Sequence, residues 1–133
     1  MTDNDSDEKA IRAVLDGVYR AWAANDADAF VAEYTEDATA ILPGSFRDGR
    51  EAIRASMAGG FAGPLKGSSA RDTVQSIRFA GTDAAIVVSE AAVLMAGESE
   101  VPAGRPVLAT WVLEKRDGAW LIAAYHNCAK TTG

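Results

Sequence analysis

The residue that stands out for its chemistry is a glutamate inside an apolar strand. Glu90 lies in the segment 85–94, AIVVSEAAVL, where strand alternation places it on one face with Val88 and other apolar side chains. A carboxylate on such a face must be paired, hydrogen-bonded or neutral, because an unpaired buried charge is costly. Such a group can act as a general acid or base. The alternative is that Glu90 pairs with Arg71 or Arg78 from a neighbouring strand, or lies at a solvated rim.

A second set of polar side chains falls in the C-terminal part of the chain. With 117–118 (Asp-Gly) as a two-residue turn, Thr110 pairs with Tyr125, and both share a face with Asn127. A hydroxyl, a phenol and an amide can orient a carbonyl or hydroxyl oxygen of a ligand. The alternative is that the three groups satisfy one another within the core.

His126 is the only histidine and is therefore the obvious further candidate for acid/base catalysis. The same register places it on the opposite face of the hairpin, with Trp111, Trp120 and Ile122. A lone histidine on an apolar face more often forms a structural hydrogen bond, here at an interface between two copies. One histidine without clustered carboxylates does not make a zinc or iron site, so we expect neither a metal nor a cofactor.

The elements that position these residues follow from hydrophobic spacing. Apolar side chains recur at helical intervals from Ile11 to Trp22 and again from Ala27 to Tyr34, and a third helix is expected from about Arg50 to Phe61. Strand patterns occupy 37–42, 46–47, 70–80, 84–95 and the two arms of the hairpin at 106–128. Helices followed by a run of strands predict an α+β domain with the helices gathered on one face of a sheet.

Composition limits the class of protein. The chain has 133 residues, a formal net charge of −6 and one cysteine, which predicts one domain at 7–129 between polar tails at 1–6 and 130–133. The acidic balance argues against nucleic acid or an anionic membrane as a partner. No segment is apolar enough to span a bilayer, and 1–10 (MTDNDSDEKA) does not fit a signal peptide, so we expect a cytoplasmic protein.

Four short motifs, in order, resemble the nuclear transport factor 2-like superfamily, which includes ketosteroid isomerase and SnoaL-like polyketide cyclases. They are NDAD at 25–28, EDAT at 36–39, GREAI at 49–53 and DGAWLI at 117–122. The ending AYHN at 124–127 is most similar to the SgcJ/EcaC subgroup, some of whose members belong to enediyne antibiotic clusters. The resemblance implies a cone-shaped roll: three N-terminal helices on a curved, mostly antiparallel mixed sheet, enclosing an apolar pocket and usually dimeric.

The resemblance also implies which residues face the pocket. It places the face of Glu90 there and the ends of the first two helix stripes nearby, with Arg47 near the mouth, where an arginine can bind an anionic group or remain exposed. The resulting candidate ligand-binding residues are Trp22, Tyr34, Val88, Glu90, Thr110, Tyr125 and Asn127. In the alignment, Leu42 occupies the position of the isomerase's general base, Val18 that of its oxyanion-hole tyrosine and Thr110 that of its neutral aspartic acid donor. Because leucine cannot accept a proton, the chain is not expected to be a ketosteroid isomerase.

Two functions remain open from the sequence. One is a cofactor-independent isomerase, cyclase or dehydratase acting on a polyketide or polyene intermediate of natural-product biosynthesis, with Glu90 moving a proton. The other is a non-catalytic binding or chaperone protein, or an assembly module, of such a pathway. In either case both faces of the sheet are largely apolar, so we expect a homodimer formed through the outer sheet face.

Overall fold

The computed structural model describes residues 2–102 and 105–131 of the chain. The helices are α1 (Thr2–Ala23), α2 (Ala27–Phe30) and α3 (Arg50–Ala62). The strands are β1 (Tyr34–Leu42), β2 (Ser45–Asp48), β3 (Ser69–Phe79), β4 (Ala84–Leu94), β5 (Val107–Arg116) and β6 (Ala119–Ala129). This arrangement confirms the predicted fold class, an α+β roll with N-terminal helices packed on a mostly antiparallel sheet.

All six strands form one sheet in the order β2-β1-β6-β5-β4-β3, with β1 and β6 parallel and the other pairs antiparallel. The turn between β5 and β6 is the predicted two-residue loop, because Arg116 pairs with Ala119. Asp117 and Gly118 have φ angles of 51° and 80°, as a type I′ turn requires. Beyond Leu113 and Ile122 the register shifts by one residue, so Trp111 pairs with Tyr125 and Thr110 with His126.

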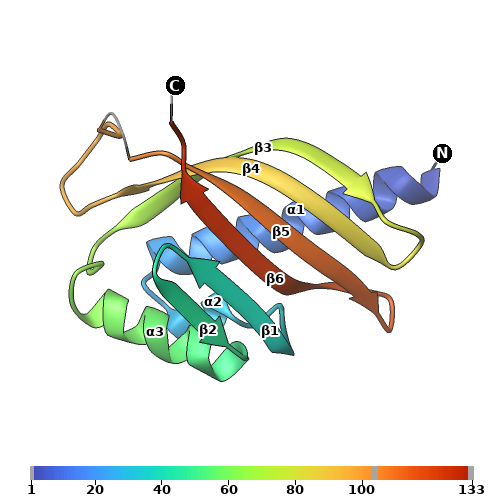
Figure 1. The fold of residues 1–133 in the computed structure, drawn as a ribbon, viewed down its shortest axis with the longest axis horizontal. Coiled ribbons are helices and arrows are strands. Elements are labelled where there is room, and N and C mark those ends of the chain that lie inside the picture. Colours follow the sequence, from blue (N-terminus) through green and yellow to red (C-terminus); the bar gives the residue numbers. More distant parts are fainter. Residues whose placement is uncertain (1, 103–104, 132–133) are drawn as a thin grey trace.

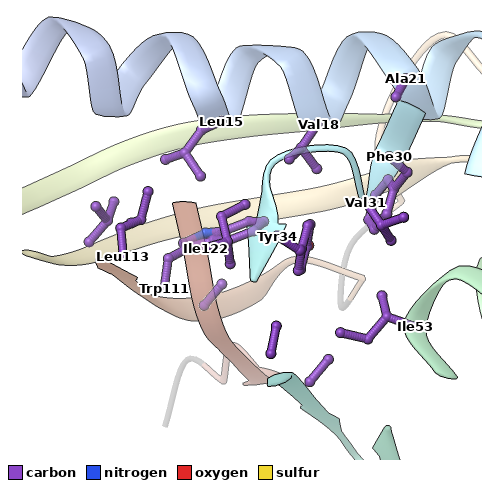
Figure 2. Packing of buried hydrophobic residues seen from close by; sticks show 14 of the residues in the cluster. Leu15, Val18, Ala21, Phe30, Val31, Tyr34, Ile53, Trp111, Leu113 and Ile122 are labelled. Atoms are coloured by element: carbon purple, nitrogen blue, oxygen red, sulfur yellow. The ribbon is translucent and has the colours of Figure 1, made fainter. Parts of the chain in front are cut away.

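The helices cover one face of the sheet, which we call the inner face. Helix α1 packs against β3 and β6, and α3 packs against β1 and β2 at the other end (Figure 1). Figure 2 shows Leu15 and Val18 of α1 directed at the sheet, above Trp111, Leu113 and Ile122. Leu15, Leu113 and Ile122 are at most 2% exposed, so their burial contributes about 1.5–3 kcal/mol each to folding.

The structure differs from the sequence prediction at two element ends. Helix α1 begins at Thr2, within the segment predicted as a polar tail. The second helix stops at Phe30, and Tyr34 is the first residue of β1 instead of the last turn of the helix. Aromatic spacing from Phe30 to Tyr34 fits a helix, but Tyr34 reaches the same core cluster from the strand. The last two residues of the predicted C-terminal tail lie outside the described part of the chain.

Within the described residues, no helix combines the length and apolar character needed to cross a bilayer.

Candidate functional site

A cavity of about 180 Å³ lies between the helices and the inner face of the sheet. Its walls come from α1, α2 and α3 and from strands β1 to β6, so the site exists only when helices and sheet are assembled. Six aromatic side chains contribute to the walls: Tyr19, Trp22, Phe30, Tyr34, Trp111 and Tyr125. Most of the remaining wall is aliphatic, which makes the cavity suited to an apolar molecule.

The aromatic walls hold one another through ring contacts. Trp22 and Phe30 meet edge to face with centroids 6.0 Å apart, and Phe30 stacks on Tyr34 at 5.9 Å. On the sheet side, the Trp111 and Tyr125 centroids are 4.4 Å apart. The indole nitrogen of Trp22 donates to the hydroxyl of the buried Ser68 at 2.8 Å. These contacts fix the rings in place, so the cavity is largely formed before any ligand arrives.

The predicted polar pair at the end of β6 does reach the cavity. Asn127 Nδ2 donates to Tyr125 Oη at 2.8 Å, and both residues line the wall. Burial raises the pKa of Tyr125, so the phenol keeps its proton. Among the described residues that proton has no acceptor, which leaves it able to donate to an oxygen of a ligand.

Arg47 of β2 also lines the cavity and is half-buried. Its Nη1 donates to Met57 Sδ at 3.6 Å, and its buried Nε has no hydrogen-bond partner among the described residues. Desolvation lowers the pKa of the guanidinium, although arginine stays protonated at any physiological pH. From the sequence, Arg47 was expected near the pocket mouth; in the structure it is part of the cavity wall.

A polar network lies behind the cavity wall. Tyr19 Oη donates to Asp72 Oδ1 at 3.2 Å, and Trp111 Nε1 donates to the fully buried Ser89 at 3.2 Å. Burial raises the pKa of the Asp72 carboxyl, while hydrogen bonds from Ser89 and Tyr19 oppose that shift. Burial likewise raises the pKa of Tyr19, which remains a phenol. Sequence reasoning missed Asp72, and the only signal was its alternation with Ala70 and Val74 on one face of β3.

The prediction that Glu90 and Val88 face the pocket is wrong. The inner face of β4 carries Ala85, Val87, Ser89 and Ala91, all buried. Glu90 lies on the outer face, where its Oε1 accepts from Lys130 Nζ at 2.7 Å. The even-numbered residues of β4, such as Ile86 and Val88, are on average larger than the odd-numbered ones and therefore look more suitable for a core. The inner face holds smaller residues instead, and there Val87 pairs with Trp111 while Ser89 accepts a hydrogen bond from its indole nitrogen.

The bulge at Ala123 corrects the hairpin prediction. With one extra residue in β6, Tyr125 and Asn127 stay on the inner face with Trp111, while Thr110 turns to the outer face. Thr110 and His126 are exposed there, and neither lines the cavity. Of the predicted ligand-binding residues, Trp22, Tyr34, Tyr125 and Asn127 line the cavity. Trp111, predicted on the opposite face, joins them.

The sequence also matches a known protein family. The model of the SnoaL-like domain matches residues 11–129. The chain belongs to the SnoaL-like family. No curated protein matches this chain significantly in sequence.

Solved structures place the SnoaL-like chain in the same fold. A domain of unknown function with a cystatin-like fold from Nostoc punctiforme is 30% identical, with a TM-score of 0.88 over 96% of this chain and 79% of that one. A putative scytalone dehydratase from Novosphingobium aromaticivorans is 20% identical, with a TM-score of 0.80 over 98% of this chain and 89% of that one. LinA is 16% identical, with a TM-score of 0.79 over 98% of this chain and 90% of its own. The last two are similar in fold alone.

The three positions aligned with the acid/base groups of ketosteroid isomerase carry different residues in this SnoaL-like domain. Leu42, at the general-base position, and Val18, at the position of the oxyanion-hole tyrosine, both line the cavity. Hydrocarbon side chains there can neither accept nor donate a proton. Thr110, at the position of the acid donor, points away from the cavity. The cavity thus has the shape of a binding site without the isomerase's proton-transfer groups.

Proposed function

We propose that this SnoaL-like domain binds a small, largely apolar molecule in the cavity between its helices and its sheet. The observation that carries the proposal is the cavity of about 180 Å³, with aromatic walls already fixed by ring contacts. A cavity of ~150 Å³ in another protein is large enough to bind benzene. The present one therefore suits a one- or two-ring aromatic compound or a short polyene better than a large polycyclic compound.

We further propose that the ligand is a polyketide or polyene intermediate of natural-product biosynthesis. The support is the similarity of residues 124–127 to the SgcJ/EcaC subgroup and the apolar, unsaturated-ring character of the walls. Aromatic side chains stack well on conjugated systems, which favours such ligands over saturated ones of the same size.

The geometry supports binding better than catalysis. Both acid/base candidates from the sequence lie on the outer face: Glu90 is paired with Lys130, and His126 is exposed. Three observations still favour a cofactor-independent isomerase, cyclase or dehydratase as a second candidate. The phenol proton of Tyr125 is available to the ligand, and the Tyr19–Asp72 pair lies directly behind the wall. One structural neighbour is also named a putative dehydratase.

Quenching of tryptophan fluorescence tests the binding function, because Trp22 and Trp111 both line the cavity. Titration with naphthalene derivatives and short conjugated polyenes should give saturable quenching. Ala91→Phe, which adds a ring on the inner face of β4, should abolish it. Ala80→Phe, the same change at an exposed position, is the matched control and should bind as the unmodified protein does. Absence of saturable binding to any of these compounds would contradict the proposal.

We also propose that two copies of the chain associate through the outer sheet face. A registered row of outer residues runs through Phe46, Ile41, His126, Thr110 and Val88. Phe46 is 64% exposed and Ile41 is 44% exposed, which is unusual for large apolar side chains on adjacent strands. Because this row is self-complementary in chemistry, a second copy is the partner that it fits best.

A further inference from the structure

Arg47 is a cation in the wall of an otherwise apolar cavity. Building on the proposed binding function, we infer that the ligand is a small apolar acid whose carboxylate pairs with the Arg47 guanidinium. The rest of the molecule then occupies the aromatic part of the cavity beside Trp22 and Phe30. The inference adds a charge and an orientation to a site whose shape alone would accept any apolar molecule of suitable size.

The other arginines of the described chain are either paired with a carboxylate or exposed to water. Three other arginines are partly buried, and each lies within 4.0 Å of a carboxylate: Arg50 with Glu36, Arg54 with Glu51 and Arg105 with Glu98. The arginines without such a partner, Arg20, Arg71 and Arg78, are exposed to water. Within the described residues, Arg47 alone combines partial burial with the absence of an ion pair.

The hydrogen bonds of the Arg47 guanidinium are incomplete within the described chain. A guanidinium offers five N–H donors, and here one is directed at a thioether sulfur, which is a weak acceptor. The Nε donor is buried and has no partner within the described chain. An unpaired buried donor costs free energy, and more so when it belongs to a charged group. A carboxylate in the cavity would accept two parallel hydrogen bonds from the fork and offset this cost.

The charge balance of the cavity wall favours a monocarboxylate as the anion. Arg47 is one positive charge, and the other arginine of the cavity wall, Arg105, is already neutralised by Glu98. A phosphate dianion would therefore leave about one negative charge uncompensated in an apolar site. Tyr125 and Tyr34 lie within electrostatic range of Arg47. The free phenol proton of Tyr125 can thus serve the same carboxylate that the guanidinium binds.

The test compares two ligands of nearly the same shape, naphthoate and naphthamide; the amide is neutral and carries an NH2 group in place of one carboxylate oxygen. Unmodified protein should bind naphthoate more tightly than naphthamide in the tryptophan-quenching titration. Arg47→Met removes the charge and the guanidinium, keeps an unbranched flexible side chain and leaves the cavity apolar. It should weaken naphthoate binding roughly tenfold or more while retaining or improving naphthamide binding. Arg116→Met, which removes an exposed charge at the β5–β6 turn, is the control for net charge and should leave both affinities unchanged.

Thermal unfolding without ligand tests independently whether the Arg47 charge is uncompensated in the free protein. Arg47→Met should raise the Tm, because it removes a desolvated cation that no carboxylate within the described chain compensates. Arg47→Lys, which keeps the charge but loses the fork, should bind naphthoate with intermediate affinity, and it carries the test if the methionine variant does not fold.

The outcomes separate this inference from the binding function. Equal affinity of the unmodified protein for naphthoate and naphthamide, with no loss in Arg47→Met, would overturn the inference and leave the binding function standing. Binding of neither compound, with no quenching by neutral polyenes, would overturn both. Weaker naphthoate binding in Arg116→Met to the same extent as in Arg47→Met would show a general charge effect and would also overturn the inference.

Discussion

The side chain of Asn25 joins the end of α1 to the loop that closes the cavity, and its removal gives a well-defined prediction. Asn25 Nδ2 donates to Trp22 O at 2.8 Å and to Ser68 O at 3.2 Å, while Oδ1 accepts from Gly67 N at 2.6 Å. Its φ angle is 52°, a left-handed conformation that asparagine and glycine tolerate. The loop tied down in this way carries Leu65, which lines the cavity.

Two substitutions separate the hydrogen bonds from the backbone conformation. Asn25→Gly keeps the left-handed conformation without strain but removes all three hydrogen bonds. At about 1 kcal/mol each, reduced because Asn25 is partly exposed, their loss should lower the free energy of unfolding by about 2 kcal/mol. Asn25→Ala removes the same bonds and adds the cost of a left-handed alanine, about 1 kcal/mol more.

Urea unfolding followed by tryptophan fluorescence measures both variants. The midpoint of Asn25→Gly should fall by about 1 M, and that of Asn25→Ala should fall further. The glycine variant should also bind naphthoate more weakly, because Leu65 is no longer held against the cavity. If Asn25→Gly lowered the free energy of unfolding by less than about 0.5 kcal/mol, the view that these three hydrogen bonds hold the loop would be refuted. A glycine variant less stable than the alanine variant would refute the role assigned to the φ angle.

Three further predictions follow from the placement of individual side chains. Glu90→Gln should leave naphthoate and naphthamide affinities within twofold of the unmodified protein, since Glu90 lies on the outer face; a larger change would return this residue to the site. Asp72→Asn should stabilise the protein increasingly as the pH rises above about 4, because a carboxyl whose pKa is raised by burial costs stability once it ionises, and urea unfolding at a series of pH values should show the gap widen and then level off. A gap that stays constant with pH would contradict the burial argument. Phe46→Asp should convert the proposed dimer to a monomer in light scattering, and a mass independent of this substitution would contradict the outer-face interface.

Much of the fold could be predicted from local patterns. The dipeptide at 117–118 fixes a two-residue turn because both residues accept a positive φ, and the observed angles agree. The third helix was expected from about Arg50 to Phe61 and is found at Arg50–Ala62, since Ile53, Met57 and Phe61 recur on one buried face. Each of these signals depends on residues close together in the chain.

The residues that line the cavity could be predicted only in part. Tyr125 and Asn127 were expected in the cavity and line it. A hairpin without a bulge would have placed Thr110 on the same face, but Thr110 lies on the other one. The bulge at Ala123 changes which residues share a face, and no residue type near it distinguishes a bulged strand from a regular one. For the same reason Trp111, which was predicted on the opposite face, lines the cavity, and Thr110, which was predicted in the cavity, lies on the outer face.

The sequence by itself therefore determined the elements, their order and the turn that joins the last two strands, because backbone conformation follows from local chemistry. Only the tertiary structure decided which face of β4 meets the helices, since both faces are largely apolar and the burial of one depends on strands and helices that are distant in the sequence. It also decided that Arg47 lies in the cavity wall without a carboxylate among the described residues, because charge pairing is a property of neighbours in space and not in sequence.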